Sequence, residues 1–96
     1  MKAYWIAHVT VTDTEAYKAY QTLAPAAFAR FGGEFLARGG DSAVMEGPDL
    51  SRHVVIAFPS LQAAKDCYAS PEYTAARAAR AGAATVHLTI VEGVAP

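Results

Sequence analysis

The side chains best suited to proton transfer in this 96-residue sequence are its three histidines, His8, His53 and His87. An unperturbed imidazole exchanges protons near neutral pH, and it also serves as a hydrogen-bond partner or a metal ligand. Arg38 adds a planar guanidinium that suits a carboxylate. The sequence contains no spacing typical of a Ser-His-Asp triad, a phosphate-binding loop or a dinucleotide-binding loop. The chemistry to consider is therefore that of imidazole and guanidinium groups.

Strands must position the histidines, because each histidine lies in a run of β-branched and aromatic residues. The predicted strands cover residues 4–11, 34–38, 53–58 and 85–92. Residues 43–46 are a possible continuation of the second strand after Gly39 and Gly40, and this glycine pair predicts a bulge or a sharp bend.

Apolar residues at helical spacing predict helices between these strands. The first helix is expected to start in a capping box over residues 12–15, with the Thr12 hydroxyl as its N-cap. Pro25 lies inside this pattern and is expected to bend or split the helix. Ser60 and Ser70 are the expected N-caps of two shorter helices, and Pro71 suits the first position of the second.

The element order predicts an α+β protein of the ferredoxin-like βαββαβ type, with both helical segments on one face of a four-stranded antiparallel sheet. Right-handed crossovers place strand 4–11 between strands 53–58 and 85–92. Neither side of strand 4–11 is polar enough to face water, so the uncovered face must meet another sheet, a partner chain or a ligand. With 53% apolar and 18% charged residues, a chain this short favours a homodimer formed through that face.

Side chains alternate along a strand, and this alternation predicts which residues point to the uncovered face. The predicted binding residues are Tyr4, His8, Thr10, His53, His87 and Thr89, joined by Arg38. His8 and His87 are expected to lie opposite each other on antiparallel strands. Strand 53–58 is expected to run parallel to strand 4–11, which would put His53 near Tyr4 and more than ~10 Å from the other two histidines. Arg38 is expected to approach His8 and to clamp an anion.

Two interpretations of these side chains stay open. His8 acts as an acid or base on a small acidic or aromatic metabolite, or the imidazoles only satisfy hydrogen bonds at a dimer interface. A metal site built on His8 and His87 would lack the further ligands and the spacing of zinc sites, so neither metal nor cofactor is expected. Arg38 either binds a ligand or forms an ion pair with Glu46, Glu92 or the partner chain.

Composition narrows the class of protein. The net charge of −1, without a basic cluster, argues against nucleic acid as a partner, and no run approaches the length of a membrane span. The single cysteine, Cys67, cannot form an internal disulfide, which favours a cytoplasmic location. Its position on an apolar helix side predicts a buried side chain without a nucleophilic role. The length predicts one domain over residues 1–96.

Four segments stand in a characteristic order along the chain. They are Tyr4-Trp5-Ile6-Ala7-His8-Val9, Ala37-Arg38-Gly39-Gly40, Ser70-Pro71-Glu72-Tyr73 and Val91-Glu92-Gly93. Together they resemble the domain of unknown function 1330 family over nearly the whole chain. The resemblance implies the dimeric α/β-barrel superfamily, in which two ferredoxin-like sheets pack face to face around a cavity. That superfamily includes cofactor-free monooxygenases, chlorite dismutase-like haem proteins, muconolactone isomerase-like enzymes and stress-responsive barrel proteins.

Two functions from different classes follow from these observations. Our working hypothesis is a homodimeric module that binds a small molecule, such as a carboxylate or an aromatic compound, or has a structural role. The alternative is a cofactor-independent enzyme of the monooxygenase, isomerase or lyase type, with His8 as acid or base. The family has no agreed activity, so the resemblance assigns no functional residues, and fold alone does not decide between these functions.

Overall fold

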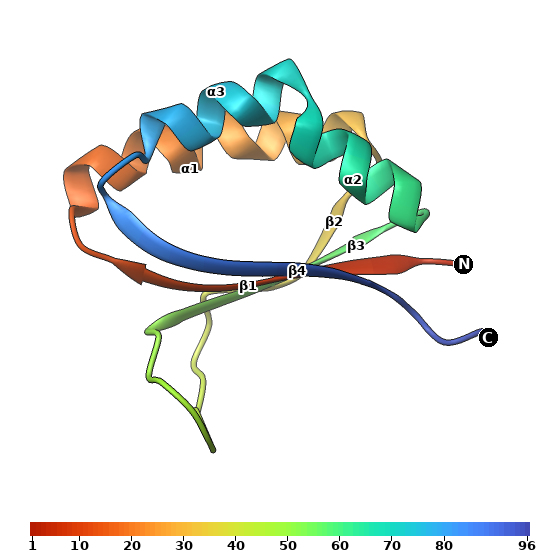
Figure 1. Ribbon diagram of the computed structural model, residues 1–96, viewed down its shortest axis with the longest axis horizontal. Coiled ribbons are helices and arrows are strands. Elements are labelled where there is room, and N and C mark those ends of the chain that lie inside the picture. Colours follow the sequence, from red (N-terminus) through yellow and green to blue (C-terminus); the bar gives the residue numbers. More distant parts are fainter.

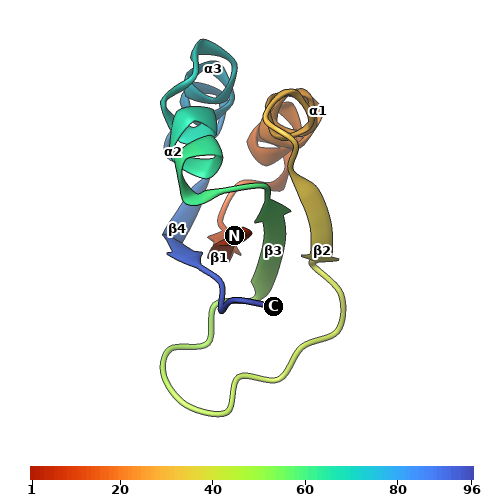
Figure 2. The same ribbon diagram turned by 90° about the vertical axis from the view of Figure 1, so that its right-hand side faces the viewer.

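The computed structural model describes residues 1–96 and contains four strands and three helices (Figure 1). In chain order they are β1 (Ala3–Val11), α1 (Thr14–Arg30), β2 (Glu34–Arg38), β3 (Arg52–Phe58), α2 (Leu61–Ala69), α3 (Pro71–Ala79) and β4 (Ala84–Glu92). The strands form one antiparallel sheet in the order β2-β3-β1-β4. The helices cover one side of this sheet, and the other side, here the bare face, has no helix on it (Figure 2). This arrangement confirms the predicted ferredoxin-like α+β fold.

The core lies between the sheet and the helices, and Trp5 is at its centre. Trp5 is 1% exposed, and its ring centroid lies 4.9–5.8 Å from the centroids of four other aromatic rings. Those rings belong to Phe28, Phe58, Tyr68 and Tyr73. Burial alternates along β1 as its sequence predicts, because odd-numbered residues from Ala3 to Val9 are buried while their even-numbered neighbours are partly or fully exposed. The central strand therefore joins the core to the bare face.

The N-terminus of α1 differs by one residue from the prediction. Asp13 is the N-cap, and its carboxylate accepts a hydrogen bond from the Ala16 N–H at 3.1 Å. Thr12 donates its own N–H to the Ala83 carbonyl instead, at 2.8 Å. Of the two effects predicted for Pro25, a bend or a split, the split does not occur, since α1 continues from Thr14 to Arg30. Buried residues on both sides of the proline hold the helix against the core, and this packing offsets the missing backbone hydrogen bond.

The junction between α2 and α3 depends on the buried side chain of Ser70. Its hydroxyl donates to the Cys67 carbonyl at 2.6 Å and accepts from the Tyr73 N–H at 3.2 Å. The serine therefore caps α3 and adds a second hydrogen bond to a C-terminal carbonyl of α2, which also accepts the Ser70 N–H at 3.1 Å. The predicted caps at Ser60 and Ser70, and the predicted position of Pro71, are confirmed.

Residues 39–51 form a loop, and the predicted continuation of the second strand over residues 43–46 is wrong. The chain leaves the sheet at Gly39, which has φ +71°, a conformation that glycine adopts without a steric penalty. Loop 39–51 projects away from the helices, on the same side as the bare face (Figures 1 and 2).

The two chain ends lie at the same end of the sheet (Figure 1). The Gly93 N–H donates to the Lys2 carbonyl at 2.8 Å, which extends the pairing of β1 and β4 by one hydrogen bond. No helix has both the length and the apolar composition needed to span a membrane.

Candidate functional site

The three histidines form a row across the three neighbouring strands β3, β1 and β4. His8 is the register partner of His53 on one side and of His87 on the other. The predicted pairing of His8 with His87 is confirmed. The predicted distance between His8 and His53 is wrong, because β3 runs antiparallel to β1. The crossover through α1 keeps β2 parallel to β1, and β3 pairs antiparallel with β2, so β3 must be antiparallel to β1 as well.

His8 and His53 are joined directly by a hydrogen bond between their ring nitrogens. The two Nδ1 atoms lie 2.8 Å apart, and the rings meet edge to face with centroids 5.1 Å apart. One Nδ1 must carry a hydrogen and the other must accept it, so the pair holds a single proton between two nitrogens. His53 is half-buried, whereas His8 and His87 are exposed on the bare face. The row therefore presents imidazole nitrogens at a surface that a ligand can reach.

A pocket of about 500 Å³ lies between the histidine row and loop 39–51. Besides the three histidines, its lining consists of Ser42, Ala43, Val44, Met45, Glu46, Pro48 and Leu50. The sequence prediction missed this wall because residues 43–46 were assigned to a strand. The flanking Gly39-Gly40 and Gly47-Pro48 pairs are typical of a loop and were the signal for it.

Three other predicted site residues lie on the sheet but outside this pocket. Thr10 pairs with Thr85, and Thr89 pairs with Ile6, at other positions along the strands. Tyr4 is farther still, with its ring against Gly93, where an added Cβ would lie 2.7 Å from the tyrosine Cε2. The structure therefore brings together the three histidines and leaves Tyr4, Thr10 and Thr89 apart from them.

Arg38 lies on the opposite side of the sheet from His8, so the predicted clamp beside that histidine is wrong. A β-bulge between Phe35 and Ala37 inserts one extra residue and reverses the facing of the residues that follow. Arg38 pairs with Val54, a residue packed against the core, and its guanidinium stacks on the Phe35 ring at 4.3 Å. It forms no ion pair with Glu46 or Glu92.

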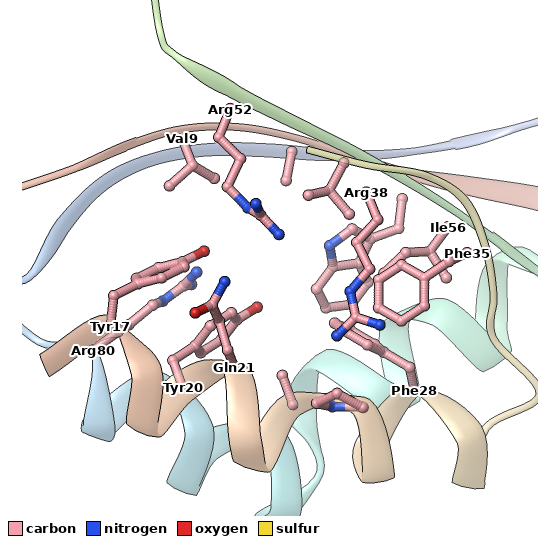
Figure 3. A pocket seen from close by; sticks show the side chains of 15 residues that line it. Val9, Tyr17, Tyr20, Gln21, Phe28, Phe35, Arg38, Arg52, Ile56 and Arg80 are labelled. Carbon is pink, nitrogen blue, oxygen red and sulfur yellow. The ribbon is translucent and has the colours of Figure 1, made fainter. Parts of the chain in front are cut away.

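Arg38 instead lines a second, smaller pocket between the sheet and α1, here the arginine pocket (Figure 3). Arg52 from β3 and Arg80, which follows α3, also line it. Tyr17 and Gln21 of α1 contribute a hydroxyl and an amide that point toward the same space (Figure 3). The sequence prediction missed this pocket, because its arginines are far apart in sequence and only the fold brings them together.

No group of three or more histidine, cysteine, aspartate or glutamate side chains is arranged to hold a metal ion.

Cys67 is fully buried, as predicted, and burial raises the pKa of its thiol to about 11. The thiol therefore stays protonated in the folded chain when an unfolded chain, with an ordinary thiol pKa near 9, begins to ionise. We expect the free energy of unfolding to be unaffected by this group below pH 9 and to decrease as the pH rises toward 11. Urea unfolding across this range should show a steeper decrease for the native chain than for Cys67→Ala. Two parallel curves would contradict the expectation.

The sheet order, the single helical layer and the bare sheet face define the ferredoxin-like α+β class of folds. Within this class the chain belongs to the family described as Domain of unknown function (DUF1330), whose model matches residues 2–94. No curated protein matches the sequence.

Two solved structures show how far the likeness extends. The first is RPA0582, a protein of unknown function from Rhodopseudomonas palustris, with 22% identity and a TM-score of 0.78 over 99% of this chain and 84% of the other. The second is SnoaB, a cofactor-independent oxygenase from Streptomyces nogalater, with 18% identity and a TM-score of 0.65 over 99% of this chain and 95% of the other. At these identities the likeness establishes a shared fold.

Proposed function

We propose that the chain forms a homodimer through its bare face and binds a small carboxylate or aromatic molecule in the pocket between the histidine row and loop 39–51. The observation that carries this proposal is that three imidazoles from three strands face one pocket. Its volume, about 500 Å³, is in the range of small-molecule sites. Five of its ten lining residues are polar, namely the three histidines, Ser42 and Glu46, and the other five are apolar.

The composition of the bare face supports self-association. Val91 is 47% exposed, and Ile6 and Val55 lie half-buried two residues closer to the histidine row along the paired strands. Leu36, at the β2 bulge, is 56% exposed. A sheet side with this many apolar residues is typical of an interface. Loop 39–51 projects on the same side, so a second copy on the bare face would enclose the histidine pocket further.

A thermal-shift screen of small carboxylates and phenols tests ligand binding at the histidine row. We expect a ligand to raise the melting temperature of the native chain and to lose this effect in His8→Ala, which removes the central imidazole. Thr10→Ala is the matched control, because Thr10 lies on the same strand and face but outside the pocket. A screen without any shift, or an equal shift in His8→Ala, would refute the proposed site.

The second candidate is a cofactor-independent enzyme with His8 as acid or base. The hydrogen bond between His8 and His53 favours this candidate. In such a pair one imidazole can accept a proton from the substrate while the other holds that imidazole in a fixed orientation. SnoaB, a cofactor-independent oxygenase, has a similar fold and is a precedent for an enzyme of this kind on such a fold. Turnover of a bound phenol without added cofactor, lost in His8→Ala, would select this candidate over simple binding. Binding without turnover would exclude it for that compound.

A further inference from the structure

The arginine pocket contains positive charge that nothing in the chain neutralises. The two ion pairs of the protein, Lys18–Glu15 and Arg30–Glu72, involve none of the arginines that line it. No aspartate or glutamate is among its lining residues. Like charges brought together without a counter-charge repel each other, so this arrangement is unfavourable when the pocket is empty.

Arg52 carries the clearest sign of a missing partner. Its Nε atom is buried and has no hydrogen-bond partner. A buried donor without a partner is unfavourable, and such a group is often found where a ligand or an ion binds. The Arg52 guanidinium lies against the backbone of Gly39. A side chain at position 39 would overlap with it, because an added Cβ would clash with the Arg52 Nη1 atom.

The other two arginines are held at the same space by aromatic rings. The Arg38 guanidinium lies 4.3 Å from the Phe35 ring centroid, and that of Arg80 lies 4.5 Å from the Tyr20 centroid. Stacking on a ring fixes the plane of a guanidinium and leaves its N–H groups free to donate in that plane. The side chains of Arg38 and Gln21 are exposed, so the pocket opens to solvent past them.

We propose that the arginine pocket binds the carboxylate group of a small organic acid. The free space measures about 40 Å³, enough for a few water molecules or one small anionic group. Guanidinium groups donate paired hydrogen bonds to the two oxygens of a carboxylate. The remaining walls include the apolar side chains of Trp5, Phe28 and Ile56, which offer no hydrogen bonds to replace the hydration shell of inorganic phosphate. This site lies on the opposite side of the sheet from the histidine row and does not depend on the proposed function.

Titration with butyrate, followed by heteronuclear NMR, tests the proposal. Butyrate is expected to bind in the millimolar range and to shift the Nε–H signal of Arg52, whereas the neutral isostere butyramide leaves it unchanged. Phosphate is the probe for an anion without an apolar tail, and binding as tight as that of butyrate would overturn the assignment to a carboxylic acid. Absence of butyrate binding to the native chain would overturn the proposal outright.

Variants locate the binding. Arg52→Gln and Arg80→Gln are each expected to weaken butyrate binding roughly tenfold or more, the usual effect of removing a charged hydrogen-bond donor. Lys65→Gln is the matched control, since it removes one exposed positive charge on α2 and leaves the pocket intact. Butyrate affinity that is unchanged in both arginine variants would refute the site. An affinity that falls in His8→Ala but not in Arg52→Gln would place the anion at the histidine row instead.

Ligand-free stability gives a second, independent measurement. If the uncompensated guanidinium groups are kept for binding, Arg52→Gln should melt at the same or a higher temperature than the native chain without ligand. A clear decrease in the melting temperature, with the core otherwise intact, would show that Arg52 has a structural role and would contradict the proposal.

Discussion

Trp5→Ala is expected to lower the free energy of unfolding by about 3–5 kcal/mol, the usual cost of removing a large buried aromatic side chain. The indole is 1% exposed and contacts four aromatic rings, so its removal leaves a cavity at the centre of the core. For a domain of this size the melting temperature should fall by about 4–8 °C per kcal/mol. Because Trp5 is the only tryptophan, unfolding is best followed by circular dichroism.

Leu23→Ala is the control for this experiment. Leu23 lies on α1 and is 45% exposed, so its truncation should change the free energy of unfolding by no more than about 0.5 kcal/mol. Equal melting temperatures for Trp5→Ala and Leu23→Ala would contradict the placement of Trp5 at the centre of the core.

Ile6→Asp is expected to weaken the proposed homodimer by roughly a hundredfold or more, since a carboxylate without a partner is strongly disfavoured inside an interface. Ile6 is on the central strand, on the bare face, and pairs with Val55 and Thr89. A two-fold interface places one such charge from each copy in the same contact region. Sedimentation equilibrium should give a dimer for the native chain and a monomer for the variant at the same concentration.

Thr74→Asp provides the matched control, because it adds the same charge at an exposed position in the first turn of α3. Ile6 is only partly buried in the single chain, so Ile6→Asp should keep its folded circular dichroism spectrum. A native chain that sediments as a monomer at high concentration, or a variant that remains dimeric, would refute dimerisation through the bare face.

Alternation along β1 was sufficient to predict the layers of this fold. Trp5, Ala7 and Val9 are buried beneath the helices, and His8 faces the other way, as their positions in the strand require. The same reasoning predicted the partner of His8 on β4, since both strands are of equal length and their ends meet. Local patterns therefore predicted the architecture and two members of the histidine row.

Two features of the site are not local. The direction of β3 follows from the path through α1 and β2, so the predicted topology already required β3 to be antiparallel to β1, and the parallel direction expected for strand 53–58 was inconsistent with that topology. A single extra residue at the bulge between Phe35 and Ala37 moves Arg38 to the helix side. Neither feature is marked by a residue type that demands it. Arg52 and Arg80 were missed for the same reason, since only the tertiary fold brings their side chains to one pocket.

The hydrogen bond between Gly93 and Lys2 makes the chain suitable for circular permutation. A short linker would connect the native ends, and new ends opened inside loop 39–51 would leave every strand and helix uninterrupted. In such a permutant the loop that covers the imidazoles would be cut. The guanidinium-lined pocket on the other side of the sheet would stay intact. One rearranged gene would thus separate the contributions of the two faces of the sheet without changing a single side chain in either.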